Sequence, residues 1–151
     1  MEFGPTSHIY AMIPTPDLTH LNREDYDKVY EPAADTFLLL DALESDAAEL
    51  KALKPRICLE IGTEAEEAQD GKDIRGAWAG GKNGMQVTDF LLEHVNGLLS
   101  PKGRFYLVAV KENNIPELQS RMRQQYGLDS KIVLQRRAGG EHLHVIRFFR
   151  G

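Results

Sequence analysis

The amino-acid sequence predicts a single α/β domain, because helix-like and strand-like patterns alternate along its 151 residues. Two apolar runs, Arg56–Ile61 and Arg104–Val110, are typical of strands buried on both faces of a sheet. Two more strand-like runs, Lys131–Arg137 and His142–Arg150, flank the turn residues 138–141, as in a β-hairpin. The order helix, strand, helix, strand, helix, strand, strand predicts a sheet that ends in an antiparallel hairpin.

Three segments have the apolar spacing of helices. The first runs from Pro32 to Leu53 and is stopped by Pro55. Its expected apolar face comprises Phe37, Leu40, Leu43, Ala47, Leu50 and Leu53. The second runs from Met85 to Leu99, with an expected face of Val87, Phe90, Leu91, Val95 and Leu98. The third begins at Asn114, where Glu117 suggests a capping box, and ends at Gly127.

Composition sets broad limits on function. The net charge of -5 argues against a protein that holds nucleic acid by charge. No apolar run reaches the ~20 residues of a membrane span, and no secretory signal is evident at the N-terminus. The single Cys58 is expected in the core, which suits a reducing compartment, so we expect the cytosol or the nucleus.

The polar, proline-containing residues 1–29 are expected to form a flexible arm, followed by one domain over residues 30–151. An arm that covers a substrate groove is the alternative. His142 and His144 alternate along a predicted strand without a third ligand, so we expect them to face solvent and predict no metal site.

The run Arg56–Ile61 starts like a nucleotide-binding site. Glu60 and Gly62 follow the apolar residues, and a glycine there lets the backbone turn close to a ligand. The next residues, 63–73, are acidic and contain one glycine, so the phosphate-cradle pattern is not completed. Further on, four glycines surround Trp78 within residues 76–84, which suggests a loop that packs this side chain over a site.

Several stretches together resemble the eukaryotic HemK-type methyltransferases, over residues 30 to about 149. These stretches are Tyr-Glu-Pro-Ala-Ala-Asp-Thr-Phe-Leu-Leu-Leu-Asp-Ala-Leu (30–43), Cys-Leu-Glu-Ile-Gly (58–62), Ala-Trp-Ala-Gly-Gly-Lys-Asn-Gly (77–84), Leu-Leu-Ser-Pro-Lys-Gly-Arg-Phe-Tyr-Leu-Val (98–108) and Lys-Glu-Asn-Asn (111–114). The resemblance implies a Rossmann-like class I methyltransferase fold that uses S-adenosylmethionine. It also implies a glutamine of a translation release factor as the substrate, with a histone lysine as a further assignment, and a small zinc-binding activator subunit as partner.

The resemblance also implies roles for individual residues. Thr36, Glu60 and Gly62 would bind the cofactor. The candidates for the substrate groove are Tyr30, Glu31, Pro32, Trp78, Gly80 and Gly81. Position 34 is Ala where the family often has Glu.

The larger departure is an absence, because the sequence has no Asn-Pro-Pro-Tyr motif, whose Asn and Pro hold the target amide in the family. The chain passes from Gly62 to a segment that the family places after this motif, so three strand-and-helix units are missing. We therefore expect a shortened form with a partial sheet of about four strands, in which Ile57–Ile61 pairs with Phe105–Val110, and we predict that methyl transfer is lost. The alternatives are a binding protein without catalysis and an unstable product.

Overall fold

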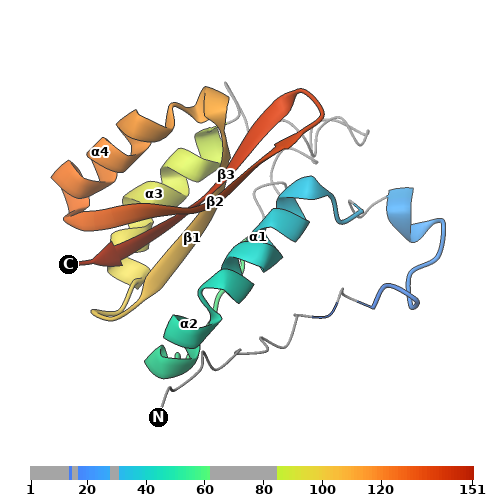
Figure 1. Ribbon diagram of the computed structural model, residues 1–151, viewed down its shortest axis with the longest axis horizontal. Helices are drawn as coiled ribbons and strands as arrows, with labels where there is room; N and C mark the ends of the chain where they lie inside the picture. Colours follow the sequence, from blue (N-terminus) through green and yellow to red (C-terminus); the bar gives the residue numbers. More distant parts are fainter. Residues whose placement is uncertain (1–13, 15–16, 28–30, 62–84) are drawn as a thin grey trace, which may run out of the picture.

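A computed structural model describes residues 14, 17–27, 31–61 and 85–151 (Figure 1). Its elements are the 3-10 helix η1 (Asp25–Asp27), α1 (Ala34–Ser45), α2 (Ala47–Leu53), α3 (Gln86–Leu98), β1 (Arg104–Val110), the 3-10 helix η5 (Lys111–Asn113), α4 (Ile115–Tyr126), β2 (Leu128–Ala138) and β3 (Glu141–Arg150). None of the helices in these ranges is long and apolar enough to cross a membrane.

The three strands form one sheet in the order β1-β3-β2, with β3 in the centre. β3 is antiparallel to both neighbours, so β1 and β2 run parallel to each other. The hairpin between β2 and β3 turns at Gly139, whose φ of 57° suits glycine. Helices α1 and α2 lie on one side of the sheet and α3 and α4 on the other (Figure 1). The α/β class and the C-terminal hairpin are confirmed.

The expected fourth strand is wrong. Arg56–Ile61 is exposed and belongs to no strand. The side chains of Ile57 and Leu59 are 88% and 68% exposed, and Cys58, expected in the core, is exposed as well. An apolar run becomes a strand only when a neighbour satisfies its N–H and C=O groups, and within the described residues β1 pairs with β3 alone.

The sheet separates two apolar clusters. Towards α3 and α4 lie Leu92, Val95, Leu107, Ala109, Ile115, Leu118, Met122, Leu128, Ile146 and Phe148. Towards α1 lie Leu38, Ala42, Leu143 and Val145, against which the partly buried Val108 and Val133 pack. Alternate residues of β3 thus enter opposite clusters, as the period of a strand requires.

Two predicted helix faces need correction. In α3, Leu92 and Val95 are buried, whereas Phe90 and Leu98 are each 65% exposed. In α1 the buried residues are Leu38 and Ala42, and Phe37 is 39% exposed. Both segments have apolar residues around most of the helix, so the spacing alone fits more than one face. The predicted helix over 32–53 is also divided, since Asp46 separates α1 from α2.

His144 is buried, which corrects the expected solvent-facing position. The reason is that β3 is central and covered on both faces. The Nδ1 of His144 lies 3.0 Å from the carbonyl oxygen of His142, and the centroids of the two imidazole rings are 4.5 Å apart. Partial burial, with the nearby His144 and Arg137, lowers the pKa of His142.

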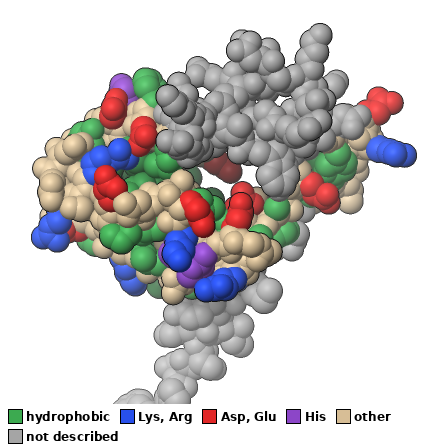
Figure 2. Space-filling view, turned by 90° about the horizontal axis from the view of Figure 1, so that it is seen from above, with side chains coloured by type: hydrophobic (Ala, Val, Ile, Leu, Met, Phe, Trp, Pro, Cys, Tyr) green, Lys and Arg blue, Asp and Glu red, His purple; other side chains and the backbone are tan. Residues whose placement is uncertain are grey.

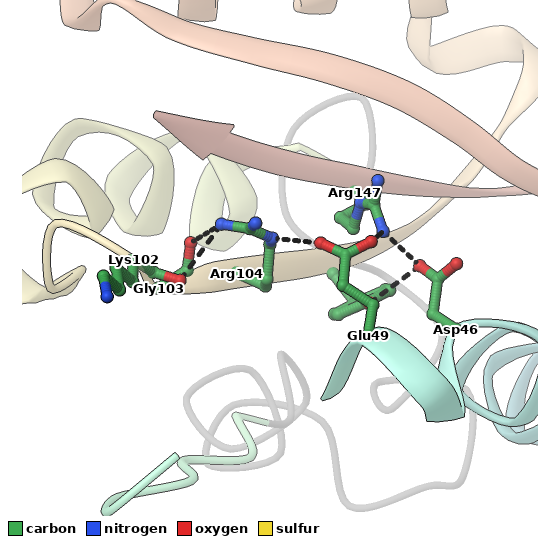
Figure 3. A network of polar contacts seen from close by, with 7 residues as sticks. Asp46, Glu49, Lys102, Gly103, Arg104 and Arg147 are labelled. Atoms are coloured by element: carbon green, nitrogen blue, oxygen red, sulfur yellow. Dashed lines mark hydrogen bonds and ion pairs between the residues drawn. The ribbon is translucent and has the colours of Figure 1, made fainter. Parts of the chain in front are cut away.

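A buried ion-pair cluster joins the α1–α2 junction to the sheet (Figure 3). Arg147 of β3 donates to Asp46 at 2.9 Å and also to Glu49. Arg104 of β1 donates to Glu49 at 2.8 Å, and the hydroxyl of Tyr106 donates to Asp46 at 2.8 Å. We call these five residues the Arg147 cluster.

The cluster shifts the pKa of Tyr106 and that of Glu49 in opposite directions. Burial, followed by the hydrogen bond to Asp46, raises the pKa of Tyr106 well above its usual range. The hydrogen bond from Arg104, and then that from Arg147, lowers the pKa of Glu49 below its ordinary value of 4.5. Within the described part of the chain, the Nε of Arg147 is buried without a hydrogen-bond partner. The contacts of Arg147 with Asp46 and Glu49 therefore offset the unfavourable desolvation of its guanidinium.

We expect Arg147→Met to lower the free energy of unfolding by about 3–5 kcal/mol, because it leaves the buried carboxylate of Asp46 without its cation. The side chains of Arg147 and Asp46 are each only 9% exposed. The matched control is Arg136→Met, whose ion pair with Asp41 has side chains 46% and 44% exposed, and should cost at most about 1 kcal/mol. Urea denaturation measures both, and equal losses would contradict the role of the cluster.

The ion pairs of Glu49 also predict a dependence of stability on pH. A carboxylate whose pKa is lower in the folded state stabilises above the unfolded value and loses this effect as the pH falls through the folded value. We expect Glu49→Gln to melt at a lower temperature than the wild-type chain at about pH 6, and the difference between the two melting temperatures to disappear as the pH falls through the lowered pKa of Glu49. A difference that stays constant across this range would show that Glu49 acts through packing.

Candidate functional site

One end of the sheet has the position at which α/β proteins bind ligands. In such folds, ligands lie beyond the carboxyl ends of parallel strands. Here β1 ends at Val110 and the parallel strand β2 ends at Ala138, whose partner Glu141 opens β3. We call this the hairpin end of the sheet. The N-terminus of α1 lies at the same end (Figure 1), where Ala34 packs against the cluster that contains Leu143.

The view from above shows several acidic side chains on this face of the described part of the molecule (Figure 2). Among the described residues, no group of three or more His, Cys, Asp or Glu side chains is arranged to hold a metal ion.

Three of the predicted site residues lie at or just before the start of α1. Glu31 is exposed, and Pro32 and Thr36 are partly buried. The backbone N–H of Thr36 donates to the carboxylate of Asp35 at 2.8 Å, and its hydroxyl lies 3.5 Å from the same oxygen. Ala33, the N-cap residue, has no side chain that could cap the helix. The carboxylate of Asp35 therefore accepts one of the free N–H groups of the first turn.

Glu60, predicted to end a buried strand beside the cofactor, instead lies on the exposed segment Arg56–Ile61. Within the described part of the chain, Glu60 belongs to no strand pair. The remaining predicted positions lie outside the described residues. They are Tyr30, Gly62, Trp78, Gly80 and Gly81.

The structure describes two of the three predicted cofactor-binding residues, Thr36 and Glu60. Binding the ribose and the amino-acid end of such a cofactor needs several polar groups held at fixed positions. Thr36 is engaged by Asp35, and Glu60 is exposed on a segment without pairing. No contact brings these two residues together within the described ranges.

Sequence reasoning missed the Arg147 cluster. Arg104 and Arg147 also lie over the ring of Phe149, with guanidinium carbons 5.3 and 5.2 Å from its centroid. Both cations are neutralised by Asp46 and Glu49, so the cluster is a structural device and offers no free charge to a ligand. An arginine within the apolar run of β3 was the only signal for it in the sequence.

No protein-family model matches the chain. Among curated proteins, the chain is 33% identical over 210 residues to methyltransferase HEMK2 of Mus musculus, an alignment that covers 90% of this chain and 96% of the mouse protein. It is 32% identical over 207 residues to methyltransferase HEMK2 of Homo sapiens, covering 89% and 95%.

Two less similar proteins are also methyltransferases by name. The chain is 27% identical over 224 residues to the eRF1 methyltransferase catalytic subunit mtq2 of Schizosaccharomyces pombe, covering 92% of this chain and 96% of the yeast protein. Among solved structures, the Mtq2-Trm112 complex of E. cuniculi, described as responsible for methylation of the eRF1 termination factor, matches with a TM-score of 0.53 and 18% identity, covering 81% of this chain and 98% of that one. This likeness confirms the fold, a Rossmann-like methyltransferase fold in shortened form.

The alignment with the mouse protein spans 210 positions, whereas this chain has 151 residues. At least 59 aligned positions of the relative, the difference between these two numbers, therefore have no counterpart here. The missing positions lie inside the aligned region, as the shortened form predicted from the sequence requires. With this identity and coverage, the chain belongs to the family of HemK-type methyltransferases.

Proposed function

We propose that this chain is a HemK-type methyltransferase by descent in which the internal deletion has abolished efficient methyl transfer. The observation that carries the proposal is the state of Arg56–Ile61. In the resemblance, this segment is the strand that presents Glu60 and Gly62 to the cofactor, whereas here it is exposed and pairs with no strand among the described residues. A protein carboxylate that must be ordered when the cofactor binds contributes less to affinity than one that is already held in place.

Estimates of cofactor affinity and of catalytic positioning also support a loss of methyl transfer. Transfer of a methyl group to an amide nitrogen depends on placing that nitrogen in line with the methyl group. The chain lacks the Asn-Pro-Pro-Tyr motif that would hold the amide. Loss of two or three hydrogen bonds to the cofactor, at roughly 1 kcal/mol each or more, weakens binding by about 100-fold. Both cofactor affinity and catalytic geometry are therefore expected to suffer.

The family supplies the substrate and partner for this proposal. The fission yeast relative is named as an eRF1 methyltransferase subunit, and the E. cuniculi relative was solved in complex with Trm112. We propose that the full-length ancestor of this chain used S-adenosylmethionine to methylate a release-factor glutamine together with a small zinc-binding activator subunit, in the cytosol or the nucleus. A histone lysine is the second substrate class that the resemblance implies.

A second candidate function is binding without catalysis. This function is favoured by the packing of the described residues, because the sheet has an apolar cluster on each face and a buried ion pair. A chain with these features is expected to melt cooperatively. An unstable product would lack such a transition.

The proposal is tested by calorimetric titration of the purified chain with S-adenosylhomocysteine, beside a thermal melt and a methyl-transfer assay on a release factor. We expect a cooperative melt, no heat of binding at micromolar concentrations and no turnover. Binding in the micromolar range, or measurable turnover, would contradict the proposed loss of function. The absence of a cooperative melt would instead identify the chain as an unfolded fragment.

A gain-of-function chimera serves as the matched control. In this chimera, the residues that the mouse relative has and this chain lacks are inserted after Thr63. If the deletion is the cause, the chimera binds S-adenosylhomocysteine under the same conditions, about 100-fold more tightly than the shortened chain. A chimera that melts cooperatively but still does not bind would place the defect elsewhere in the chain.

A further inference from the structure

Strand β1 is paired along one edge only within the described residues, where its seven residues face β3. The other edge of such a strand presents N–H and C=O groups that can pair with a strand of another chain. We infer that this edge of β1 pairs antiparallel with the same edge of a second copy. The two three-stranded sheets then become one continuous sheet in a two-fold symmetric dimer.

The two outer strands of the sheet differ in how they discourage such pairing. β2 has a register shift between Ile132 and Leu134 and carries the exposed cations Lys131, Arg136 and Arg137. Bulges and charges of this kind protect natural edge strands. β1 has neither over Phe105–Val110, where its register with β3 is regular and no residue is charged. The unprotected edge is thus β1.

The sequence of β1 is compatible with pairing to itself. In an antiparallel register centred on Leu107, Arg104 of one copy faces Val110 of the other, and Tyr106 faces Val108. No two charges of like sign are then opposite each other, which would otherwise destabilise the pair. Because the same patch meets itself, the contact closes after two copies and does not propagate into a fibre.

The layers on either side of β1 favour a second copy over an isolated peptide strand. On one face, Tyr106 bonds to Asp46 beside α2, and on the other Leu107 packs with Leu92 of α3. A strand added at this edge needs cover on both faces to bury its apolar side chains. A second copy brings α2 and α3 with its own β1, whereas a peptide brings no helices.

Light scattering after gel filtration tests this inference on the complete 151-residue chain. We expect a mass of two chains at high concentration and dissociation on dilution. A single-chain mass at every concentration up to about 200 µM would overturn the inference, because a specific dimer should bind at least in this range.

A matched pair of variants assigns the interface. Val108 of β1 and Val133 of β2 are both partly buried and pack against the same apolar cluster. Val108→Lys should weaken the dimer by about tenfold or more, because it places a charge in the strand pair, and Val133→Lys should leave it unchanged. Loss of the dimer in Val133→Lys alone would overturn the inference.

A third variant separates the two ways in which a second copy can cover the edge. Leu59 is 68% exposed on Arg56–Ile61, a segment that can also add to a free edge. Leu59→Ser should leave the dimer intact. If it abolishes the dimer, the edge is covered by Arg56–Ile61 of the second copy, and the pairing of β1 with β1 is wrong.

Amide hydrogen exchange of the wild-type chain decides the matter if Val108→Lys does not fold. Amides of β1 should exchange about tenfold more slowly at high than at low protein concentration, while those of β2 should not change. Equal exchange of β1 at both concentrations would overturn the inference.

Discussion

The guanidinium of Arg147 fixes the layer of α1 and α2 on the sheet, and the arrangement of the described chain depends on it. Its carboxylate partners Asp46 and Glu49 lie 101 and 98 residues away in the sequence. Arg104 and Tyr106 bring β1 into the same cluster. Polar contacts have directions that apolar contacts lack, so the cluster sets where α2 lies along β1 and β3. Because α1 directly precedes α2, this placement also brings the start of α1 to the hairpin end of the sheet.

This arrangement gives the three-stranded sheet an apolar cluster on each face within the described residues. The central strand β3 is covered on both faces, by α1 on one and by α3 and α4 on the other. The chain also has an ion-pair cluster that bridges residues before and after the deletion. Arg56–Ile61, which follows α2, is exposed and belongs to no strand of this sheet. In folds of this kind, the residues that form the core and those that carry the chemistry are different sets.

The deletion also changes what the remaining sheet exposes. A strand built for the interior of a larger sheet has an apolar sequence and no protective charges, and β1 keeps these features over Phe105–Val110. β2 has the charges and the register shift of a natural edge. We propose both the loss of methyl transfer and the pairing edge of β1 as consequences of the same missing segment.

The sequence by itself determined the fold class, the hairpin, the strand at 104–110 and the three helical segments, because period and turn residues are local signals. It also carried the family resemblance and the missing Asn-Pro-Pro-Tyr motif. Only the tertiary structure decided which faces are buried, since Phe90 and Leu92 of α3 are equally apolar but only Leu92 packs on the sheet. The tertiary structure also decided that Arg56–Ile61 is not a strand and that His144 is buried. Both depend on which neighbours are present to pair with the backbone or to cover a face, and no local pattern contains that information.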